Sequence, residues 1–513
     1  MLQMINLKRT AFFCLFLAIH SLSHGQADIS KHYLVEDVPT PIGMDPQVGG
    51  IDFTPDGRLA ACFHRGEVYT FNPSTGVWKL FAEGLQEPLG LVAVSNHELV
   101  VMQRSELTRL QDLDLDGKAD AYTNLWNGFG MTGNYHEFAF GPVRDAQGNF
   151  YVSLNLASNG ASIRPEIRGQ FHPIGLAKED FYDKPWSKVK NIAGRMYSRV
   201  PWRGWVIKVS PNGKVQPFAS GFRSPNGLGF DNKGNLFVTD NQGDWLGTSK
   251  CYHVQKGGFY GHPASLVWKN DWNENPLETP VEKLNQLRSP AAFLFPQGEV
   301  ANSPTQPICD TTGGKFGPFD GQMLVGEMNV PRILRLLQDE VDGNVQGAVV
   351  TFIENAGLRR GIHRLAFSPD KKSLYIGQTA LSWAGSKGIQ RIKYTGVSPM
   401  EIVGIKAMKK GFKLSFNQKI GMDSVSSLPS TYKTWTYHYH KSYGSPKVDA
   451  QETKLKSIRI SDDGKSLFFE TEPHKKGFIH EFNIAGLKSQ DGTKLINGKV
   501  TYHMVETPAA KSL

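Results

Sequence analysis

The chain has 513 residues, of which 40% are hydrophobic and 20% are charged. This composition excludes a disordered or fibrous protein, and the length exceeds what a single hydrophobic core usually supports. Glycine (53 residues) and proline (29 residues) are abundant, and short apolar runs between turn residues outnumber helical patterns. These features predict an all-β protein.

The first 25 residues are expected to be a secretory signal peptide. Lys8 and Arg9 precede an apolar run over residues 11–19, which is too short to span a bilayer. Small residues then stand just before residue 26, as at a signal cleavage site. Cys14 lies inside the apolar run, which argues against a lipoprotein anchor. We therefore expect an exported protein, periplasmic or secreted, without stable membrane insertion.

The net charge and the cysteines limit the partners. The formal net charge is +9 at pH 7, and excess positive charge attracts anions. An exported chain without a nucleic-acid motif favours an acidic sugar or an acidic cofactor over nucleic acid. Beyond the leader, Cys62, Cys251 and Cys309 are either three buried thiols or one disulfide, with Cys251–Cys309 as the candidate pair, plus a free thiol. No Cys-x-x-Cys-His motif occurs, so no c-type haem is expected.

A repeated phrase runs through the first three quarters of the chain. Each copy has an apolar strand, usually a turn built on Asp, Asn or Gly, and a second apolar strand, as in a tight hairpin. The six copies begin at Gly49, Pro88, Tyr135, Ser224, Phe316 and Gly361. Such radial repetition predicts a six-bladed β-propeller over residues 26–396, with loops from every blade meeting at one end of a central channel.

The stretch "QDLDLDGKADAY" has the spacing of a calcium loop. Asp112, Asp114, Asp116 and Asp120 stand at positions one, three, five and nine, and Gly117 stands at the turn. Oxygen ligands at alternating positions can wrap one Ca²⁺ ion. We expect a structural calcium site here, the alternative being a solvated acidic turn.

An insertion interrupts the repeats at about residues 159–203. It carries nine basic and four acidic residues. Its aromatic residues are Phe171, Phe181, Tyr182, Trp186, Tyr197 and Trp202. Two interpretations stay open: a lid over a pocket that binds an anionic sugar, or an excursion that packs its aromatic rings on the propeller.

Polar and basic residues gather at the predicted strand ends. In the stretch "SPNGLGFDNKGNLFVTDNQGDW" the second strand ends in Asn241, Gln242, Asp244 and Trp245, which are candidate substrate-binding residues. Trp245 either stacks on a sugar ring or packs within a blade. The other candidates at strand ends are His136, Arg223, Tyr260, His262, Arg359, Arg360, His363 and Arg364. Histidine can transfer protons near neutral pH, and arginine can clamp an anionic group.

The repeated phrase vanishes at about residue 397, and short strands continue to the end. Residues 397–513 are therefore expected to form a C-terminal β-sandwich of the immunoglobulin-like type. His438 and His440 share one face of a predicted strand. Without further ligands in view, they are expected to be surface histidines.

Three stretches resemble the soluble quinoprotein glucose/sorbosone dehydrogenase-like propellers. They are "GFRSPNGLGFDNKGNLFVTDNQG", "HVQKGGFYGHP" and "GIHRLAFSPDKKSLYIGQT". These stretches resemble even more closely the sequences of secreted propeller proteins of Bacteroidetes and planctomycetes, which are often described as membrane-bound or haem-linked dehydrogenases. The resemblance covers about residues 48–395. It implies a six-bladed propeller, a pyrroloquinoline quinone cofactor, an external electron acceptor and a sugar substrate.

The resemblance also assigns roles to individual residues. It implies that His136 is the catalytic base and that Arg223 is the arginine of an Arg-Asn pair, whose asparagine position holds Ser224 here. Tyr260 and His262 fall in the segment that borders the pocket, with His262 in place of a tryptophan. His363, at the start of a later phrase, completes the set of candidate catalytic residues.

Three functions stay open from the sequence. The first is a sugar dehydrogenase, in which His136 removes a hydroxyl proton while a hydride passes to a quinone. The second is a polysaccharide lyase or oligosaccharide dehydratase that acts by β-elimination on an acidic or sulfated glycan. The third is a non-catalytic glycan-binding propeller. No Gly-x-Ser-x-Gly, P-loop or His-Glu-x-x-His motif points to a hydrolase or a nucleotide enzyme.

Overall fold

The computed structural model describes residues 29–158, 168–175, 195–380 and 385–509. The predicted signal peptide lies outside these residues, as does most of the insertion, including Phe181, Tyr182 and Trp186. In the part of the chain that is described, no helix is both long enough and apolar enough to cross a membrane.

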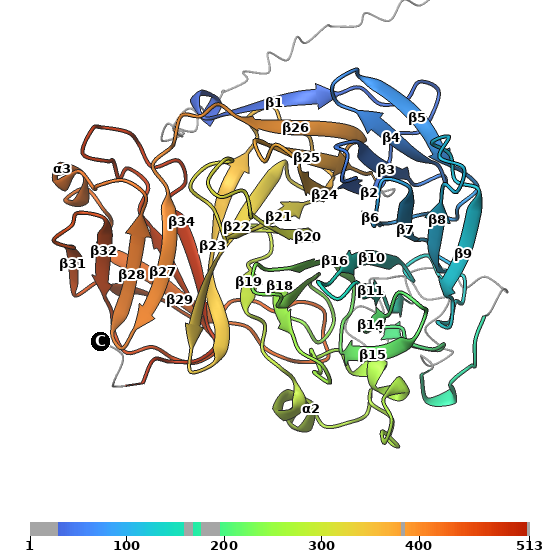
Figure 1. Ribbon diagram of the computed structural model, residues 1–513. Coiled ribbons are helices and arrows are strands. Elements are labelled where there is room, and N and C mark those ends of the chain that lie inside the picture. Colours follow the sequence, from blue (N-terminus) through green and yellow to red (C-terminus); the bar gives the residue numbers. More distant parts are fainter. Residues whose placement is uncertain (1–28, 159–167, 176–194, 381–384, 510–513) are drawn as a thin grey trace, which may run out of the picture.

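Six blades of four antiparallel strands surround a central axis (Figure 1). Blade 1 holds β2 (Val48–Phe53), β3 (Leu59–Phe63), β4 (Val68–Asn72) and β5 (Val77–Ala82). Blade 2 holds β6 (Leu91–Ala93), β7 (Glu98–Met102), β8 (Leu107–Gln111) and β9 (Ala121–Trp126). Blade 3 holds β10 (Ala139–Arg144), β11 (Phe150–Leu154), β14 (Trp205–Val209) and β15 (Val215–Ser220).

The remaining blades follow the same plan. Blade 4 holds β16 (Pro225–Phe230), β17 (Leu236–Asp240), β18 (Ser249–Val254) and β19 (Phe293–Phe295). Blade 5 holds β20 (Pro304–Cys309), β21 (Met323–Glu327), β22 (Arg332–Val341) and β23 (Asn344–Glu354). Blade 6 holds β24 (Ile362–Phe367), β25 (Ser373–Gln378), β26 (Gly388–Tyr394) and β1 (Tyr33–Val38). The predicted all-β fold with a six-bladed propeller is therefore confirmed.

The ring is closed by its first strand. β1 pairs antiparallel with β26, in the register Tyr33↔Tyr394, so the two ends of the propeller share blade 6. The inner strands β2, β6, β10, β16, β20 and β24 contact one another in a circle. A Cβ atom on Gly90 would lie 1.9 Å from the carbonyl oxygen of Gly141 on the next inner strand, so only glycine permits this approach.

Close packing of the inner strands seals the channel. Beside Gly50, Gly90 and Gly141 the remaining space is about 10 Å³, which is at the limit for one water molecule. A ligand can therefore occupy the end of the channel but has no room to pass through it.

Short polar turns explain the repeated phrase. At the tips of the hairpins in blades 1, 3 and 4, Gly57, Gly148 and Gly234 have φ angles of 90°, 84° and 82°, which favour glycine. Asp145 Oδ1 accepts hydrogen bonds from the backbone N–H groups of Gln147 and Asn149 and so fixes one of these turns. In blade 5 the phrase that begins at Phe316 spans β21 and β22, and the inner strand β20 precedes it.

The C-terminal strands form a sandwich that is continuous with blade 5. One sheet has β27 (Ile402–Met408), β28 (Gly411–Phe416), β31 (Ser457–Ile460) and β32 (Ser466–Glu470). The other has β29 (Thr431–Thr436), β30 (Val448–Lys454), β33 (Phe478–Asn483) and β34 (Lys499–Met504). β34 pairs with the outer strand β23, so this second sheet and blade 5 make one eight-stranded sheet.

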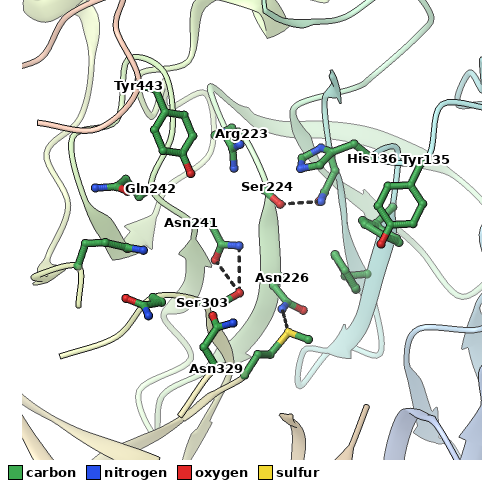
Figure 2. A pocket seen from close by; sticks show the side chains of 16 residues that line it. Tyr135, His136, Arg223, Ser224, Asn226, Asn241, Gln242, Ser303, Asn329 and Tyr443 are labelled. Atoms are coloured by element: carbon green, nitrogen blue, oxygen red, sulfur yellow. Dashed lines mark hydrogen bonds between the residues drawn. The ribbon is translucent and has the colours of Figure 1, made fainter. Parts of the chain in front are cut away.

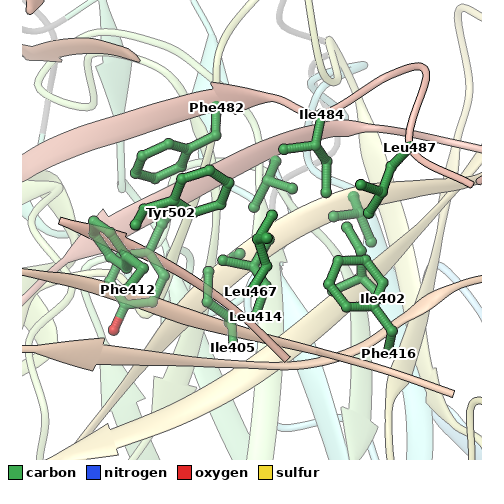
Figure 3. Close-up of a cluster of buried hydrophobic side chains, with 14 of the residues drawn as sticks. Ile402, Ile405, Phe412, Leu414, Phe416, Leu467, Phe482, Ile484, Leu487 and Tyr502 are labelled. Carbon is green, nitrogen blue, oxygen red and sulfur yellow. The ribbon is translucent and has the colours of Figure 1, made fainter. Parts of the chain in front are cut away.

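The sandwich core therefore reaches into the propeller. Phe412, Phe482 and Tyr502 pack between the two sheets (Figure 3), and Leu337 and Val350 of blade 5 belong to the same buried cluster. β22 and β23 have 10 and 11 residues, which carries them beyond the blade to meet the sandwich. The sandwich consequently has a fixed position beside blades 4 and 5.

The other described elements are short. β12 (Ala157–Ser158) pairs with β13 (Met196–Tyr197) at the two ends of the insertion. The helices are η1 (Ile29–Lys31), η2 (Pro173–Gly175), η4 (Pro263–Trp268), α2 (Val281–Leu287) and α3 (Met422–Val425). Cys62, Cys251 and Cys309 are buried free thiols, so a Cys251–Cys309 disulfide is not formed.

Candidate functional site

A polar cavity of about 260 Å³, here called the mouth cavity, lies at the end of the channel over blades 3, 4 and 5 (Figure 2). Inner strands begin, and their antiparallel neighbours end, at this same end of the propeller. Pro225 at the start of β16 is thus paired with Asp240 at the end of β17. The fold therefore gathers the residues before each inner strand and after each second strand around one space.

His136 stands on the wall of the mouth cavity before β10. Its Nδ1 lies 2.8 Å from the carbonyl oxygen of Leu156, so Nδ1 carries the proton and donates this hydrogen bond. Burial, together with the nearby charge of Arg223, lowers the pKa of His136 to about 3. The neutral ring therefore keeps a lone pair on Nε2, which is the form that accepts a proton.

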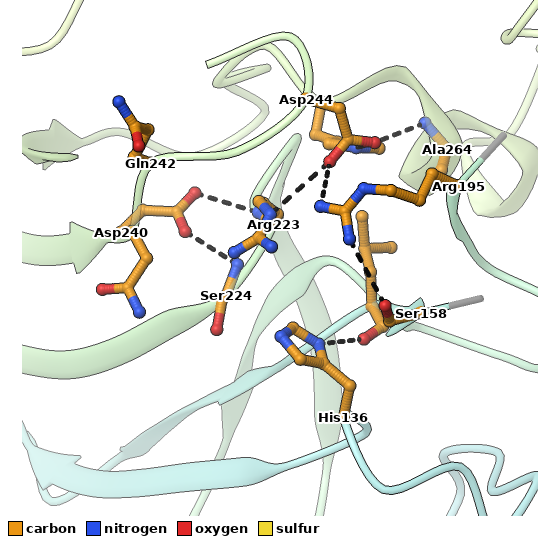
Figure 4. A network of polar contacts seen from close by, with 12 residues as sticks. His136, Ser158, Arg195, Arg223, Ser224, Asp240, Gln242, Asp244 and Ala264 are labelled. Carbon is orange, nitrogen blue, oxygen red and sulfur yellow. Dashed lines mark hydrogen bonds and ion pairs between the residues drawn. The ribbon is translucent and has the colours of Figure 1, made fainter. Parts of the chain in front are cut away.

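Arg223 reaches the cavity from the loop before β16. Its backbone N–H and that of Ser224 donate hydrogen bonds to the Asp240 carboxylate, at 2.9 and 2.7 Å. Its Nε lies 3.5 Å from Asp244 Oδ1. The Asp240 carboxylate thus fixes the loop, and the ion pair with Asp244 orients the guanidinium (Figure 4).

Asp244 is the centre of a buried ion cluster behind the cavity. Arg195 donates to Asp244 Oδ1 at 2.9 Å, and His262 Nε2 lies 3.2 Å from Asp244 Oδ2. Burial opposes ionisation of Asp244, but Arg195, His262 and Arg223 together hold its pKa well below the usual range. The cluster therefore ties the end of the insertion to the loop that carries Arg223.

The sandwich supplies one wall of the cavity, which the sequence did not reveal. Residues 437–447, here called the roof loop, connect β29 to β30, and Tyr443 forms an antiparallel bridge with Asp244. Gly444 N–H donates to the Gly243 carbonyl at 2.8 Å. Figure 2 shows the Tyr443 hydroxyl pointing into the cavity. The ring lies 5.1 Å from the Arg195 guanidinium and 5.5 Å from that of Arg223.

Amides are the most frequent side chains in the lining. Seven of them face the cavity: Asn155, Asn226, Asn241, Gln242, Gln297, Asn302 and Asn329. Asn241 and Gln242 were expected from the sequence, and the other five stand at the same kind of strand end in blades 3 to 5. Their positions at strand ends could have identified them from the sequence, but the same pattern does not distinguish them from amides on the outer loops.

Four predicted site residues of blade 4 lie outside the lining, namely Asp244, Trp245, Tyr260 and His262. Trp245, predicted to bind substrate, is fully buried and packs 5.6 Å from the Tyr439 ring. Tyr260 is buried too, and its hydroxyl donates to the His253 carbonyl. His262 is buried behind the cavity against Asp244. These side chains are buried behind the cavity and do not line it. The prediction that they contact a substrate directly is therefore wrong for each of them, as it is for Asp244.

The candidates of blade 6 are also outside the cavity. His363 is buried below it, with Nε2 3.0 Å from Asn226 Oδ1. Arg364 is buried and donates to the Leu89 carbonyl at 2.7 Å. Arg359 pairs with Asp37, and Arg360 is exposed. The ring places blade 6 beside blades 1 and 5, so these arginines do not meet Arg223 in one pocket.

The predicted calcium loop joins β8 to β9 on blade 2. Ligand oxygens of Asp112, Asp114 and Asp116 lie within 4.8 Å of one another. Asp112 Oδ1 is buried and has no hydrogen-bond partner among the described residues. Asp120 is outside this group, and its Oδ2 accepts hydrogen bonds from two backbone N–H groups. Three carboxylates with an unpaired buried oxygen fit a hard cation such as Ca²⁺.

Calcium is expected to stabilise the fold through this loop. At a hundred times its dissociation constant, an ion that binds only the folded chain adds about 2.7 kcal/mol. EDTA should therefore lower the melting temperature of the wild type, and Asp114→Ala should remove that sensitivity. Identical melting curves of metal-stripped protein with and without Ca²⁺ would show that the loop is only an acidic turn.

The cavity does not fit the quinone cofactor that the sequence resemblance implies. Pyrroloquinoline quinone carries three carboxylates, which require several cationic partners. Among the described residues, Arg223 is the one arginine or lysine in the lining, and it already shares its charge with Asp244. The other lining groups are amides, hydroxyls, aromatic rings, a methionine and the neutral His136. These donors match a polyhydroxylated ligand better than a tricarboxylate.

One family model matches part of the chain. Residues 76–260 match a family model described as a domain of unknown function, DUF7133. No curated protein matches the chain.

Solved structures that are similar include sugar dehydrogenases. A putative glucose dehydrogenase from Thermus thermophilus is 18% identical, with a TM-score of 0.47, 70% of this chain covered and 99% of that one. The quinone-bound aldose sugar dehydrogenase from Streptomyces coelicolor is 14% identical (TM-score 0.47; 71% and 98% covered). The quinone domain of pyranose dehydrogenase from Coprinopsis cinerea is 13% identical (TM-score 0.47; 72% and 97% covered).

Proposed function

We propose that this protein is a carbohydrate-active enzyme in which His136 accepts a proton from a sugar unit bound in the mouth cavity. One observation carries the proposal: a neutral histidine with its Nδ1–H already bonded shares a small cavity with seven amide side chains. An amide carries both a donor and an acceptor, as a sugar hydroxyl does. Asn226, Asn241 and Gln242 use part of theirs in hydrogen bonds within the protein, and the remaining amide groups of the lining complement sugar hydroxyls. A volume near the lower end for ligand pockets suits one sugar unit.

Arg223 gives the site a preference for a negative group. Its guanidinium is oriented by Asp244 and lies 5.5 Å from the ring of Tyr443, which lines the same cavity. A single carboxylate on the sugar would meet Arg223 without repulsion, because no acidic side chain among the described residues faces the cavity. Acidic sugars are therefore the preferred substrates, and this agrees with the net charge of +9.

Elimination is the reaction for which the cavity itself supplies every group. His136 would take the proton from the carbon next to the sugar carboxylate, and Arg223 would stabilise the negative charge that develops on the carboxylate oxygens. The Tyr443 hydroxyl, on another wall of the same cavity, would deliver a proton to the leaving oxygen. The carbon–oxygen bond breaks, a carbon–carbon double bond forms, and no redox partner is needed.

Oxidation is the second candidate, and it also has an observation in its favour. His136 and Arg223, the two residues that match the sugar dehydrogenase motifs, do line one cavity. His136 would then take the hydroxyl proton, while a hydride would pass to a quinone-type acceptor. Because the lining does not match a tricarboxylate, this reaction requires an acceptor with fewer charges or an external one.

A product assay separates these functions. The purified protein is incubated with neutral, uronic and sulfated saccharides, with and without a quinone acceptor, and the products are weighed by mass spectrometry. A product that lacks two hydrogens shows oxidation, whereas cleavage to an unsaturated sugar or loss of water shows elimination. Saccharide binding without any product would indicate a non-catalytic glycan-binding propeller. If the protein neither binds a saccharide nor forms a product, the proposal is refuted. Export through residues 1–25 would bring the enzyme to extracellular glycans.

Tyr443 is expected to contribute to saccharide binding through its hydroxyl. Tyr443→Phe keeps the ring beside the two guanidinium groups and removes one hydrogen-bonding group, which should raise Kd about 3- to 10-fold. Calorimetric titration with the best-binding saccharide measures this change. Tyr439→Phe is the matched control, because Tyr439 is in the same loop and donates to the Gly261 carbonyl outside the lining. Equal Kd values for both variants would remove Tyr443 from the site.

The pH profile should lack a titration of His136 near its ordinary pKa of 6.5. Because the pKa of His136 is lowered to about 3, the ring stays neutral and able to accept a proton from pH 8 down to about 4. The acid side of the kcat/KM profile, which reports groups of the free enzyme, should therefore show no His136-dependent step between pH 5 and 8. A proton-linked step at about pH 6.5, seen by NMR of the His136 ring, would contradict this.

A further inference from the structure

A second depression, here called the side groove, lies at the same end of the propeller as the mouth cavity. It has a volume of about 1080 Å³ and is lined by loops of blades 1, 2 and 3. Gln47 and Gln86 precede inner strands, and His64 and Arg104 follow second strands. The residues of the groove therefore lie at the same kind of strand end as those that line the mouth cavity. The two spaces therefore open on one face of the ring.

Arg104 forms the partition between the two spaces. Its Nη2 donates to the carbonyl oxygens of Asn134 and Tyr135, at 2.7 and 3.3 Å, and its guanidinium lies 5.7 Å from the Phe138 ring. On the groove side its Nη1 pairs with Glu87 Oε2 at 2.8 Å. Tyr135, which lines the mouth cavity, stands on this partition and is 44% exposed. A ligand that extends beyond the mouth cavity would meet the Tyr135 ring first and the side groove next.

The lining of the groove is polar and includes an unsatisfied group. Asp45, Glu87, Arg65, Arg104 and Arg168 give it charges of both signs. His64, which also lines it, has a buried Nε2 atom with no hydrogen-bond partner among the described residues. Such a lining offers many donors and acceptors beside apolar surface from Leu85 and Met131, a combination that suits the polar edges and apolar faces of sugar rings.

Size separates the roles of the two spaces. Pockets for drug-sized ligands range over about 300–1,000 Å³, so the mouth cavity is small for one ligand and the groove is large. Resting on the proposed function, we infer that the side groove binds further sugar units of a chain whose reacting unit sits beside His136. The substrate class is then an oligosaccharide or a polysaccharide end, and a free monosaccharide is a poor substrate.

Binding as a function of chain length tests this inference. The probe is a glycan array, followed by calorimetry, with mono- to hexasaccharides of neutral, uronic and sulfated series. We expect affinity to rise at least about tenfold from the monosaccharide to the tetrasaccharide of the preferred series, because each added hydrogen bond contributes about 0.5–1.5 kcal/mol.

Two groove variants then locate the added contacts. Arg65→Ala changes a side chain that is 72% exposed, and His64→Gln changes the one with the unpaired nitrogen. Each should weaken tetrasaccharide binding at least about threefold and leave monosaccharide binding unchanged. Lys214→Ala, on an exposed turn between β14 and β15, is the matched control and should change neither. Melting curves confirm that every variant is folded.

The outcomes separate this inference from the proposed function. If affinity does not depend on chain length, or if both groove variants bind the tetrasaccharide as the wild type does, the groove is not a subsite, and the function at His136 stands. If His136→Ala abolishes turnover of a chain while the groove variants weaken only its binding, both are supported. If no saccharide of any length binds, both are overturned.

Discussion

Replacing His136 by alanine is expected to lower kcat by at least about a hundredfold, because proton transfer by a positioned side chain typically contributes 10²- to 10⁴-fold. The change removes the Nε2 acceptor and the hydrogen bond from Nδ1 to the Leu156 carbonyl, but the side chain is only half-buried on the cavity wall. The melting temperature should consequently stay close to that of the wild type. Initial rates on whichever saccharide turns over, measured beside melting curves, provide the test.

His438→Ala is the matched control for His136→Ala. His438 is exposed on the roof loop, and its side chain does not line the mouth cavity. The His438→Ala protein should retain full activity. This result would show that activity depends on His136 and does not fall after the loss of another histidine near the cavity. A His136→Ala protein with wild-type kcat would place the chemistry in another part of the molecule.

Among the proposed substitutions, Asp244→Ala is expected to lower the free energy of unfolding most. Asp244 is 1% exposed, and its removal leaves two buried guanidinium groups, Arg195 and Arg223, without their anion. Breaking a buried pair in this way costs about 3–5 kcal/mol, because one charge stays buried and uncompensated. Urea titration followed by tryptophan fluorescence should show a lower unfolding free energy, and saccharide binding should fall as Arg223 loses its orientation.

Asp56→Ala is the control for this change. Asp56 pairs with Arg58 on the surface, where such pairs contribute about 0–1 kcal/mol. Asp244→Asn adds a second comparison, because it keeps the shape and removes only the charge, and it should also destabilise. If Asp244→Ala lowers the unfolding free energy no more than Asp56→Ala does, the buried ion cluster does not hold the site together.

The propeller could be read from the sequence because its signal is local and repeated. Each hairpin needs an apolar strand, a turn that accepts a positive φ angle, and a second strand, and Gly57, Gly148 and Gly234 mark three of these turns. Strand ends also placed His136, Arg223, Asn241 and Gln242 around one space, because antiparallel pairing fixes which ends meet.

The direction of individual side chains could not be read in the same way. Trp245 follows the same strand as Asn241 and Gln242, yet its positive φ of 68° turns it into a buried cluster with Leu246 and Phe259. Tyr443 belongs to the sandwich and reaches the cavity only because β34 extends the sheet of blade 5 and so fixes the roof loop against blade 4. Contacts between segments about 200 residues apart leave no pattern in a single sequence.

The central claim is that the mouth cavity transforms a saccharide through His136, and product mass tests it most directly. Wild type, His136→Ala and His438→Ala are each incubated with the acidic and neutral oligosaccharide series, and the products are followed by mass spectrometry. We expect a new product from an acidic oligosaccharide with the wild type and with His438→Ala, and at least about a hundredfold slower formation with His136→Ala. Formation of the same product at the same rate by His136→Ala would contradict it.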